Sequence, residues 1–226
     1  MPVNKERYRE LKTELDAKGV TLIAVSKTKP VADLLELYEL GQRDFGENYV
    51  QELVEKKAVL PPDIRWHFIG HLQRNKVKLL APFVHLIHGV DSFSLLEEIN
   101  SQAAKNNRTL SVLLQMHIAS EETKFGLAED ELKTLIADLA DVPLPHIRIE
   151  GLMGMASNTT QAEKITAEFS FLQQLFQQYA SLKTSTIRLT QLSMGMSSDY
   201  GLAIAHGSTM VRIGSLLFGA RDMPSR

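Results

Sequence analysis

Residues 21–30 read Thr-Leu-Ile-Ala-Val-Ser-Lys-Thr-Lys-Pro, and the fold of the chain can be worked out from this segment. Its first five residues form an apolar run rich in β-branched side chains, which is typical of a strand buried on both faces. Pro30 then opens a helical pattern over residues 31–40, in a first-turn position that proline tolerates. Lys27 therefore lies where a buried strand runs into a loop, and parallel α/β folds build their sites at that end of a strand.

Lys27 admits two interpretations. A primary amine held there, partly out of water, can have a lowered pKa and act as a nucleophile towards an aldehyde. Alternatively, the lysine caps the strand in solvent, because most lysines are exposed surface residues. The segment alone leaves both interpretations open, so the decision depends on what the rest of the chain brings to the same place.

The rest of the chain repeats a strand followed by a helix. The predicted strands are residues 21–25, 44–48, 66–70, 85–90, 110–118, 147–155, 187–192 and 208–213. The predicted helices are residues 4–18, which end at Gly19, then 31–40, 49–60, 72–80, 93–105 with Ser92 as the cap, 128–140, 162–179 and 198–205. Strict alternation favours a parallel sheet, because parallel neighbours need a crossover helix between them.

Eight such units in about 225 residues match the size of a closed (β/α)8 TIM barrel. We therefore expect one domain over residues 1–226. Only residues 216–226 follow the segment after the last strand, so we expect the extra N-terminal helix to fill the gap beside that strand. An open doubly wound sheet is the alternative, but no Gly-x-Gly-x-x-Gly turn follows any strand.

Composition excludes several classes of protein. The net charge of −2 gives no electrostatic argument for nucleic acid or an anionic membrane. The chain has no cysteine, so it has neither disulfides nor thiolate chemistry. No apolar run is long enough to span a bilayer, and the polar start lacks a signal region. We expect a cytoplasmic protein, and a monomer because no helix pattern leaves a second apolar stripe.

Arg212 lies within an apolar strand pattern in the segment Gly-Ser-Thr-Met-Val-Arg-Ile-Gly-Ser over residues 207–215. A buried guanidinium must meet an acceptor, which is either a structural carboxylate or a group on a ligand. Gly214 and Ser215 open the turn after this last strand. In eight-stranded barrels, the loops after the seventh and eighth strands commonly hold a phosphate.

The loop after the seventh predicted strand, Ser-Met-Gly-Met-Ser-Ser-Asp over residues 193–199, supplies a matching half. Ser197 and Ser198 can donate hydroxyl groups to a phosphate, although they can equally cap a helix. Because the first and eighth strands are neighbours in a closed barrel, these loops, Arg212 and Lys27 describe one pocket.

Several other polar residues lie at predicted strand ends. Asn48 could lie beside a ring or cap a helix. His67, His71 and His117 are more often hydrogen-bonded structural residues than catalysts. No metal-ligand spacing such as His-Glu-x-x-His occurs. Met153, Met155, Met194 and Met196 would suit a pocket wall, but core packing is their ordinary role.

At this point the sequence resembles a known family, the pyridoxal phosphate homeostasis proteins of the YggS/PROSC type. The matching segments, in family order, are residues 24–30 (Ala-Val-Ser-Lys-Thr-Lys-Pro), 45–52 (Phe-Gly-Glu-Asn-Tyr-Val-Gln-Glu), 66–70 (Trp-His-Phe-Ile-Gly) with 72–73 and 75–76, 151–153 (Gly-Leu-Met), 192–197 (Leu-Ser-Met-Gly-Met-Ser), 207–214 and 218–221 (Phe-Gly-Ala-Arg). The resemblance thus covers nearly the whole chain.

The resemblance implies a pyridoxal 5'-phosphate barrel like the N-terminal domain of alanine racemase, with Lys27 as the Schiff-base lysine. It also implies that Arg212 meets the pyridine nitrogen and that Asn48 lies near the ring. The phosphate would be held by Ser197, Gly214 and Ser215. Two positions depart from the family pattern: His117 stands where asparagine is frequent, and His71 replaces a commoner proline.

Arginine is a donor that keeps its proton, so an arginine at the ring nitrogen makes the cofactor a weak electron sink. Alanine racemase, by resemblance, adds a tyrosine from its second subunit and a second β-domain; we find no tyrosine well placed for that role here. We expect a protein that carries pyridoxal phosphate and serves vitamin B6 and amino-acid homeostasis, with apo-enzymes as recipients. The alternatives are a low-activity amino-acid racemase and a Schiff-base aldolase, of which the aldolase leaves Arg212 unexplained.

Overall fold

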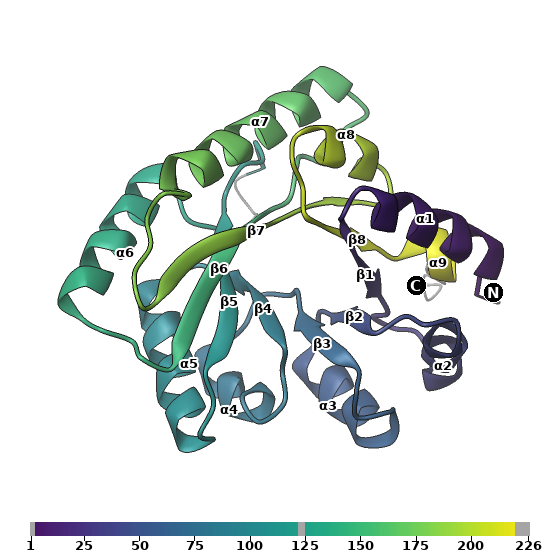
Figure 1. Ribbon diagram of the computed structural model, residues 1–226, viewed down its shortest axis with the longest axis horizontal. Helices are drawn as coiled ribbons and strands as arrows, with labels where there is room; N and C mark the ends of the chain where they lie inside the picture. The colour runs from purple at the N-terminus through teal and green to yellow at the C-terminus, as the bar shows by residue number, and fades with distance from the viewer. Residues whose placement is uncertain (1–2, 122–124, 220–226) are drawn as a thin grey trace.

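A computed structural model describes residues 3–121 and 125–219, and its centre is a closed barrel of parallel strands (Figure 1). The strands are β1 (Thr21–Val25), β2 (Asp44–Glu47), β3 (Arg65–Phe68), β4 (Leu86–Val90), β5 (Leu110–Met116), β6 (Ile147–Gly154), β7 (Ile187–Met196) and β8 (Met210–Ile213). They follow one another around the barrel in chain order, and β1 pairs with β8 to close it. The prediction of a TIM barrel is confirmed.

Helices cover the outside of the barrel, as the alternation predicts (Figure 1). They are α1 (Lys5–Ala17), α2 (Val31–Glu39), α3 (Val50–Val59), α4 (Val77–Leu80) after a 3-10 turn η1 (Arg74–Lys76), α5 (Phe93–Lys105), α6 (Glu129–Asp141), α7 (Ala162–Tyr179), α8 (Tyr200–Ala205) and α9 (Ser215–Phe218). No helix in the described ranges is both long and apolar enough to cross a membrane. Ala220 and Arg221 of the last family motif lie outside the described residues.

The N-terminal helix α1 lies against β1 and α9, beside the closing strand pair, as expected from the short C-terminal segment (Figure 1). Asn4 caps its first turn by accepting a hydrogen bond from the Arg7 backbone N–H at 3.0 Å. Gly19 has a φ of +64°, and the N–H groups of Gly19 and Val20 donate to the last carbonyls of the helix. This arrangement is the Schellman ending that glycine permits.

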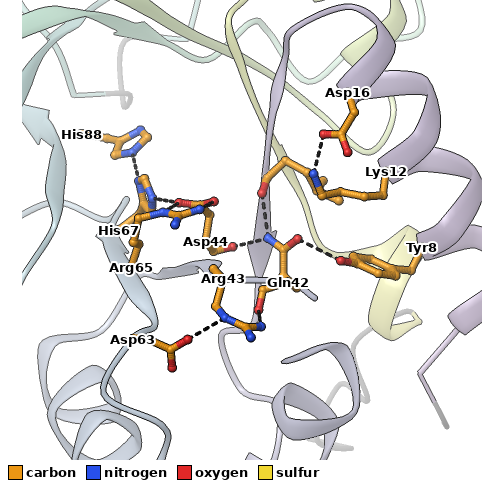
Figure 2. A network of polar contacts seen from close by, with 11 residues as sticks. Tyr8, Lys12, Asp16, Gln42, Arg43, Asp44, Asp63, Arg65, His67 and His88 are labelled. Atoms are coloured by element: carbon orange, nitrogen blue, oxygen red, sulfur yellow. Dashed lines mark hydrogen bonds and ion pairs between the residues drawn. The ribbon is translucent and has the colours of Figure 1, made fainter. Parts of the chain in front are cut away.

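Gln42 ties this helix to the barrel (Figure 2). Its buried amide nitrogen donates to the carbonyls of Leu22 and Asp44, at 2.8 and 2.6 Å. Its oxygen accepts a hydrogen bond from the Tyr8 hydroxyl at 3.4 Å. One side chain therefore joins α1, β1 and β2 and satisfies buried polar groups on all three.

Several predicted boundaries differ from the structure, such as the helix predicted over residues 72–80, of which α4 covers only Val77–Leu80. Helix α2 begins at Val31 as predicted, but Pro30 stands just before it with an extended backbone (φ −68°, ψ 154°) and not in its first turn. Strand β7 continues four residues past the predicted end at Leu192, because the pairing register shifts at Gly195, whose φ is +93°. A bulge at glycine lets a strand bend and continue.

The inside of the barrel differs from the layers of branched apolar residues that are usual in this fold. One part is a small apolar cluster of Leu86, Leu113, Met153 and Met210. The remainder includes buried polar side chains that the strand period of two places on the same inner face. These are Asp44, His67, His88, Ser193 and Arg212. The larger apolar core lies between the strands and the outer helices.

Candidate functional site

A cavity of about 460 Å³ opens at the carboxyl ends of β1, β7 and β8. The residues that line it include all six cofactor-binding residues predicted from the sequence: Lys27, Asn48, Ser197, Arg212, Gly214 and Ser215. They come from four separate strand ends that closure of the barrel brings together. The structure therefore places the whole predicted set around one space.

The turn that carries Lys27 is fixed from below by buried charges. Lys56, on α3, donates to the backbone carbonyl of Ser26 and to carboxylate oxygens of Glu47 and Glu52, each at 2.7 Å. The Ser26 hydroxyl donates to Glu47 at 2.6 Å. Burial raises the pKa of the Glu47 carboxyl, and the charge of Lys56 partly offsets that rise.

Lys29 is a second amine of this cavity that the sequence argument did not single out. Its Nζ donates to the carbonyl of Phe218 at 2.8 Å, so it also links the turn after β1 to α9. Thr28 between the two lysines has a φ of +63°, which turns the chain so that both lysines reach the same cavity. The repeated Lys-x-Lys spacing was the available signal.

Arg212 is 4% exposed, so its guanidinium must find acceptors inside the protein. Its Nη1 donates to the carbonyl and hydroxyl of Ser193, at 2.8 and 2.5 Å, and its Nη2 donates to the carbonyl of Gly154 at 2.9 Å. These contacts are with a serine and two backbone carbonyls, whereas the sequence left a structural carboxylate and a ligand group open as acceptors. Burial lowers the pKa of Arg212 to about 10, which still leaves the guanidinium charged at neutral pH.

The loops predicted to hold a phosphate also line the cavity. The backbone N–H of Gly214 donates to the Ser197 hydroxyl at 3.2 Å, so that hydroxyl keeps its own proton to donate. A Cβ at Gly214 would meet the carbonyl oxygen of Val25 at 3.2 Å, which explains why the chain has glycine there. Ser198 also lines the cavity, as its hydroxyl chemistry suggested.

Asn48 is held at the cavity by the end of β3. A Cβ at Gly70 would lie 2.3 Å from the Asn48 carbonyl oxygen, so only glycine allows these two segments to approach. The side-chain oxygen of Asn48 is buried and has no hydrogen-bond partner among the described residues. A buried acceptor of this kind is costly unless a ligand supplies a donor.

The other polar candidates lie away from the cavity lining. His71 stacks on Phe125, with ring centroids 3.9 Å apart, and its Nδ1 lies 3.3 Å from Asp91. His117 contacts the carbonyl of Glu121 at 3.0 Å. Both departures from the family pattern therefore change loop contacts around the barrel mouth.

The methionines divide between the two roles considered for them. Met155 and Met196 line the cavity, whereas Met153 and Met194 are buried in the core. The split follows the strands: the two lining residues come last on or just after β6 and β7. Sequence alone gave no reason to separate the pairs.

The chain matches the family model described as alanine racemase, N-terminal domain, over residues 4–222, which include every residue of the cavity. The pyridoxal phosphate homeostasis protein of Vibrio alginolyticus is 42% identical over 221 residues, covering 96% of this chain and 93% of that protein. The similarity is thus spread over the full length of both.

Among solved structures, PipY of Synechococcus elongatus PCC7942 is similar in two states. Its structure without PLP has a TM-score of 0.88 and 38% identity, and its structure with PLP bound has a TM-score of 0.85 and 37% identity. Each match covers 95% of this chain and 99% of that chain. The same barrel therefore occurs with and without PLP in that protein.

Proposed function

The chain belongs to the pyridoxal phosphate homeostasis proteins, a family built on the alanine racemase N-terminal domain, and from that premise we propose that it binds pyridoxal 5'-phosphate in the cavity above β1, β7 and β8. The protein serves intracellular pyridoxal phosphate, or vitamin B6, homeostasis. The observation that carries this proposal is the convergence of an amine, a buried guanidinium and a hydroxyl-rich loop on one cavity.

The residues present fit this cofactor. Pyridoxal phosphate supplies an aldehyde that condenses with primary amines and a pyridine ring that withdraws electrons. Lys27 provides the amine, and Ser197, Gly214 and Ser215 provide hydroxyl and backbone donors for a phosphate. The orphaned oxygen of Asn48 offers an acceptor to a hydroxyl on the ring.

Arg212 decides what the bound cofactor can do. Its guanidinium donates and keeps its proton, so a ring nitrogen facing it stays unprotonated. No tyrosine among the described residues lines the cavity, although racemization needs acid–base groups on both faces of a substrate carbanion. These features support a carrier of the cofactor, with weak racemase activity as the second candidate because the fold is shared with alanine racemase.

The first test is the near-visible absorbance of the protein as purified and after addition of pyridoxal phosphate. We expect a band that shifts with pH in the wild type and in Lys29→Ala, and none in Lys27→Ala. Lys29→Ala is the matched control, because both amines line the same cavity. A band that persists in Lys27→Ala and disappears in Lys29→Ala would move the attachment to the other lysine. No band in any of the three would reject cofactor binding.

The carrier and racemase functions are separated by incubating the loaded protein with single L-amino acids and assaying for the D-enantiomer. The carrier function predicts no turnover beyond trace levels, since no tyrosine of the described residues lines the cavity and Nζ of Lys29 donates to the carbonyl of Phe218. Robust D-product would reject it in favour of the racemase.

We also propose that the chain acts as a cytoplasmic monomer, over residues 1–226 as one cofactor-binding domain, and that apo-enzymes receive the cofactor from it. Mixing the loaded protein with an apo pyridoxal enzyme should restore that enzyme's activity. A phosphatase added as a scavenger of free cofactor would abolish the restoration if delivery needed no contact. Analytical ultracentrifugation tests the monomer, and a dimer peak would contradict it.

A further inference from the structure

A continuous chain of buried hydrogen bonds crosses the inside of the barrel from Asp44 to Arg212. The Asp44 carboxylate lies 3.0 Å from Nε2 of His67, and Nδ1 of His67 lies 3.0 Å from Nε2 of His88 (Figure 2). Nδ1 of His88 lies 3.0 Å from the Ser193 hydroxyl, which accepts from Arg212. The two histidines and the serine are at most 1% exposed. The chain thus joins the starting ends of β2 and β3 to the cavity.

Asp44, at one end of this hydrogen-bond chain, is held as an ionised carboxylate. Arg65 donates to both of its carboxylate oxygens, at 2.7 and 2.5 Å. Burial alone would raise the pKa of Asp44, but the hydrogen bonds and charges of His67 and Arg65 outweigh it and hold that pKa well below its usual range. An ionised carboxylate only accepts hydrogen bonds, so His67 must carry a proton on Nε2.

With both histidines neutral, that single proton sets the direction of every later bond. A neutral His67 has a bare Nδ1, which accepts the Nε2 proton of His88. His88 is then bare at Nδ1, and the Ser193 hydroxyl donates to it. The serine oxygen keeps its lone pairs for Arg212. Burial, together with the charge of Arg212, lowers the pKa of His88 well below its ordinary value, so His88 is neutral, as this scheme requires.

This chain of hydrogen bonds is unsuited to conducting protons. It would end at Arg212, which does not give up a proton near neutrality. What it transmits is orientation, because each member can donate in only one direction once the carboxylate is ionised and both histidines are neutral. Arg212 therefore receives a hydroxyl acceptor of fixed polarity, and the Asp44 carboxylate stays four hydrogen bonds away.

We propose that His88 and Ser193 are positioning residues for Arg212, and that the ionised Asp44 at the other end of the barrel sets the hydrogen-bond direction that keeps a serine lone pair facing the guanidinium. The proposal rests on the proposed function, since the guanidinium so held is the one that would face the cofactor ring. The acceptors that orient the guanidinium are neutral, and the carboxylate whose charge acts on it is the buried Asp199.

Asp44→Asn is the decisive variant, because an asparagine of the same shape can donate as well as accept. A donating amide would leave His67 protonated on Nδ1, and His88 would then carry its proton on Nδ1 as well. That proton would point at the Ser193 oxygen and compete with Arg212. The matched control is Asp63→Asn, because Asp63 pairs with Arg43 and lies outside the hydrogen-bond chain from Asp44 to Arg212 (Figure 2).

The first measurement is 15N NMR of the histidine rings in the cofactor-free protein. We expect His67 and His88 to be neutral and protonated on Nε2 in the wild type and in Asp63→Asn, and His88 to move towards the Nδ1 tautomer in Asp44→Asn. An unchanged His88 tautomer in Asp44→Asn would overturn the proposal. This arm needs no cofactor, so it decides even if the protein proves unable to bind pyridoxal phosphate, an outcome that rejects the proposed function alone.

The second measurement is the dissociation constant of pyridoxal phosphate by absorbance titration. We expect Asp44→Asn and Ser193→Ala each to weaken binding about fivefold, the loss of one net hydrogen bond. The double variant should bind pyridoxal phosphate no more weakly than the more affected single variant, because both substitutions interrupt the same chain of hydrogen bonds. Unchanged affinities, or effects that multiply in the double variant, would overturn the positioning role.

Discussion

Lys27 owes its position to a turn that is costly to form. Thr28 has a φ of +63°, and a β-branched residue in the left-handed region costs about 1–2 kcal/mol. Its side chain is exposed, so little packing offsets that cost. The compensation comes from the backbone: the Thr28 N–H donates to Glu52 at 2.6 Å, and Glu52 in turn accepts from Lys56. The buried Lys56 thus stabilises the turn that presents the half-buried Lys27.

Replacing Lys56 with methionine should destabilise the protein by about 3–5 kcal/mol at neutral pH, since it leaves a buried carboxylate without its cation. The pKa of Glu47 is already raised above its unfolded value, so the folded state holds its proton more tightly and stability falls as pH rises through that window. Without Lys56, the folded-state pKa of Glu47 should lie higher still. The deficit of Lys56→Met should therefore shrink from pH 8 to pH 5 in urea unfolding.

The control is Lys57→Met, an exposed neighbour on the same helix, which should leave stability nearly unchanged at either pH. A deficit of Lys56→Met that stays constant across pH would show that lost packing, rather than the unpaired carboxylate, causes the effect.

At this scale the sequence indicated which residues meet the cavity and left out what holds them. Arg212 was recognisable because a guanidinium inside an apolar strand pattern needs a partner. Its actual partners are backbone carbonyls and a serine, which no pattern of residue types identifies. His88 was missed for the same reason, since a histidine in a strand is ordinary until the residue facing it across the barrel is known.

Among the elements, β7 shows where propensity fails. Helices with clear caps were predicted closely: α5 begins after Ser92, whose hydroxyl accepts from the Leu95 N–H at 3.3 Å. Strand β7 extends beyond its predicted end at Leu192, although the residues that follow, rich in glycine, serine and methionine, are weak strand formers. Pairing with β8 overrides that preference and carries the strand to Met196, where the loop with Ser197 starts.

Gly195→Ala should destabilise the protein by about 2–4 kcal/mol, from the strain of a positive φ and a steric clash. The φ is +93°, and the new Cβ would lie 2.5 Å from the Cβ of Ala203 on α8. Gly201→Ala on the same helix is the control, because a Cβ there meets nothing within 4 Å. It should be neutral or stabilising by about 0.5–1 kcal/mol in the same chemical denaturation experiment. Equal effects of the two substitutions would contradict the bulge argument.

On the scale of the whole molecule, the alternation of strands and helices was enough to predict a closed barrel. It was not enough to predict the interior, which combines a small apolar cluster with the polar chain from Asp44 to Arg212. Strand spacing places a side chain on the inner face, but which inner residues touch depends on the register of all eight strands. The function carried by the carboxyl ends of the strands therefore rests on contacts that reach the opposite end of the barrel.

That interior makes the barrel sensitive to mild acid. Burial, with the charge of Arg212, holds the folded pKa of His88 well below the unfolded value near 6.5. Below about pH 6.5, His88 binds a proton in the unfolded chain but stays unprotonated in the folded barrel. His88 therefore lowers the free energy of unfolding by up to about 1.4 kcal/mol per pH unit as pH falls from about 6.5.

Asp44, whose folded pKa is also lowered, loses its contribution only below about pH 4. Burial lowers the pKa of His85 as well, so the comparison with a His88 variant is what separates the two histidines between about pH 6.5 and pH 5. In urea unfolding across that window, the stability advantage of the wild type over His88→Gln should narrow steadily. The stability difference between the wild type and His206→Gln, a change at the end of α8, should stay constant. A constant gap for both variants would mean that His88 is protonated inside the folded barrel, and the hydrogen-bond direction assigned to the chain would then be wrong.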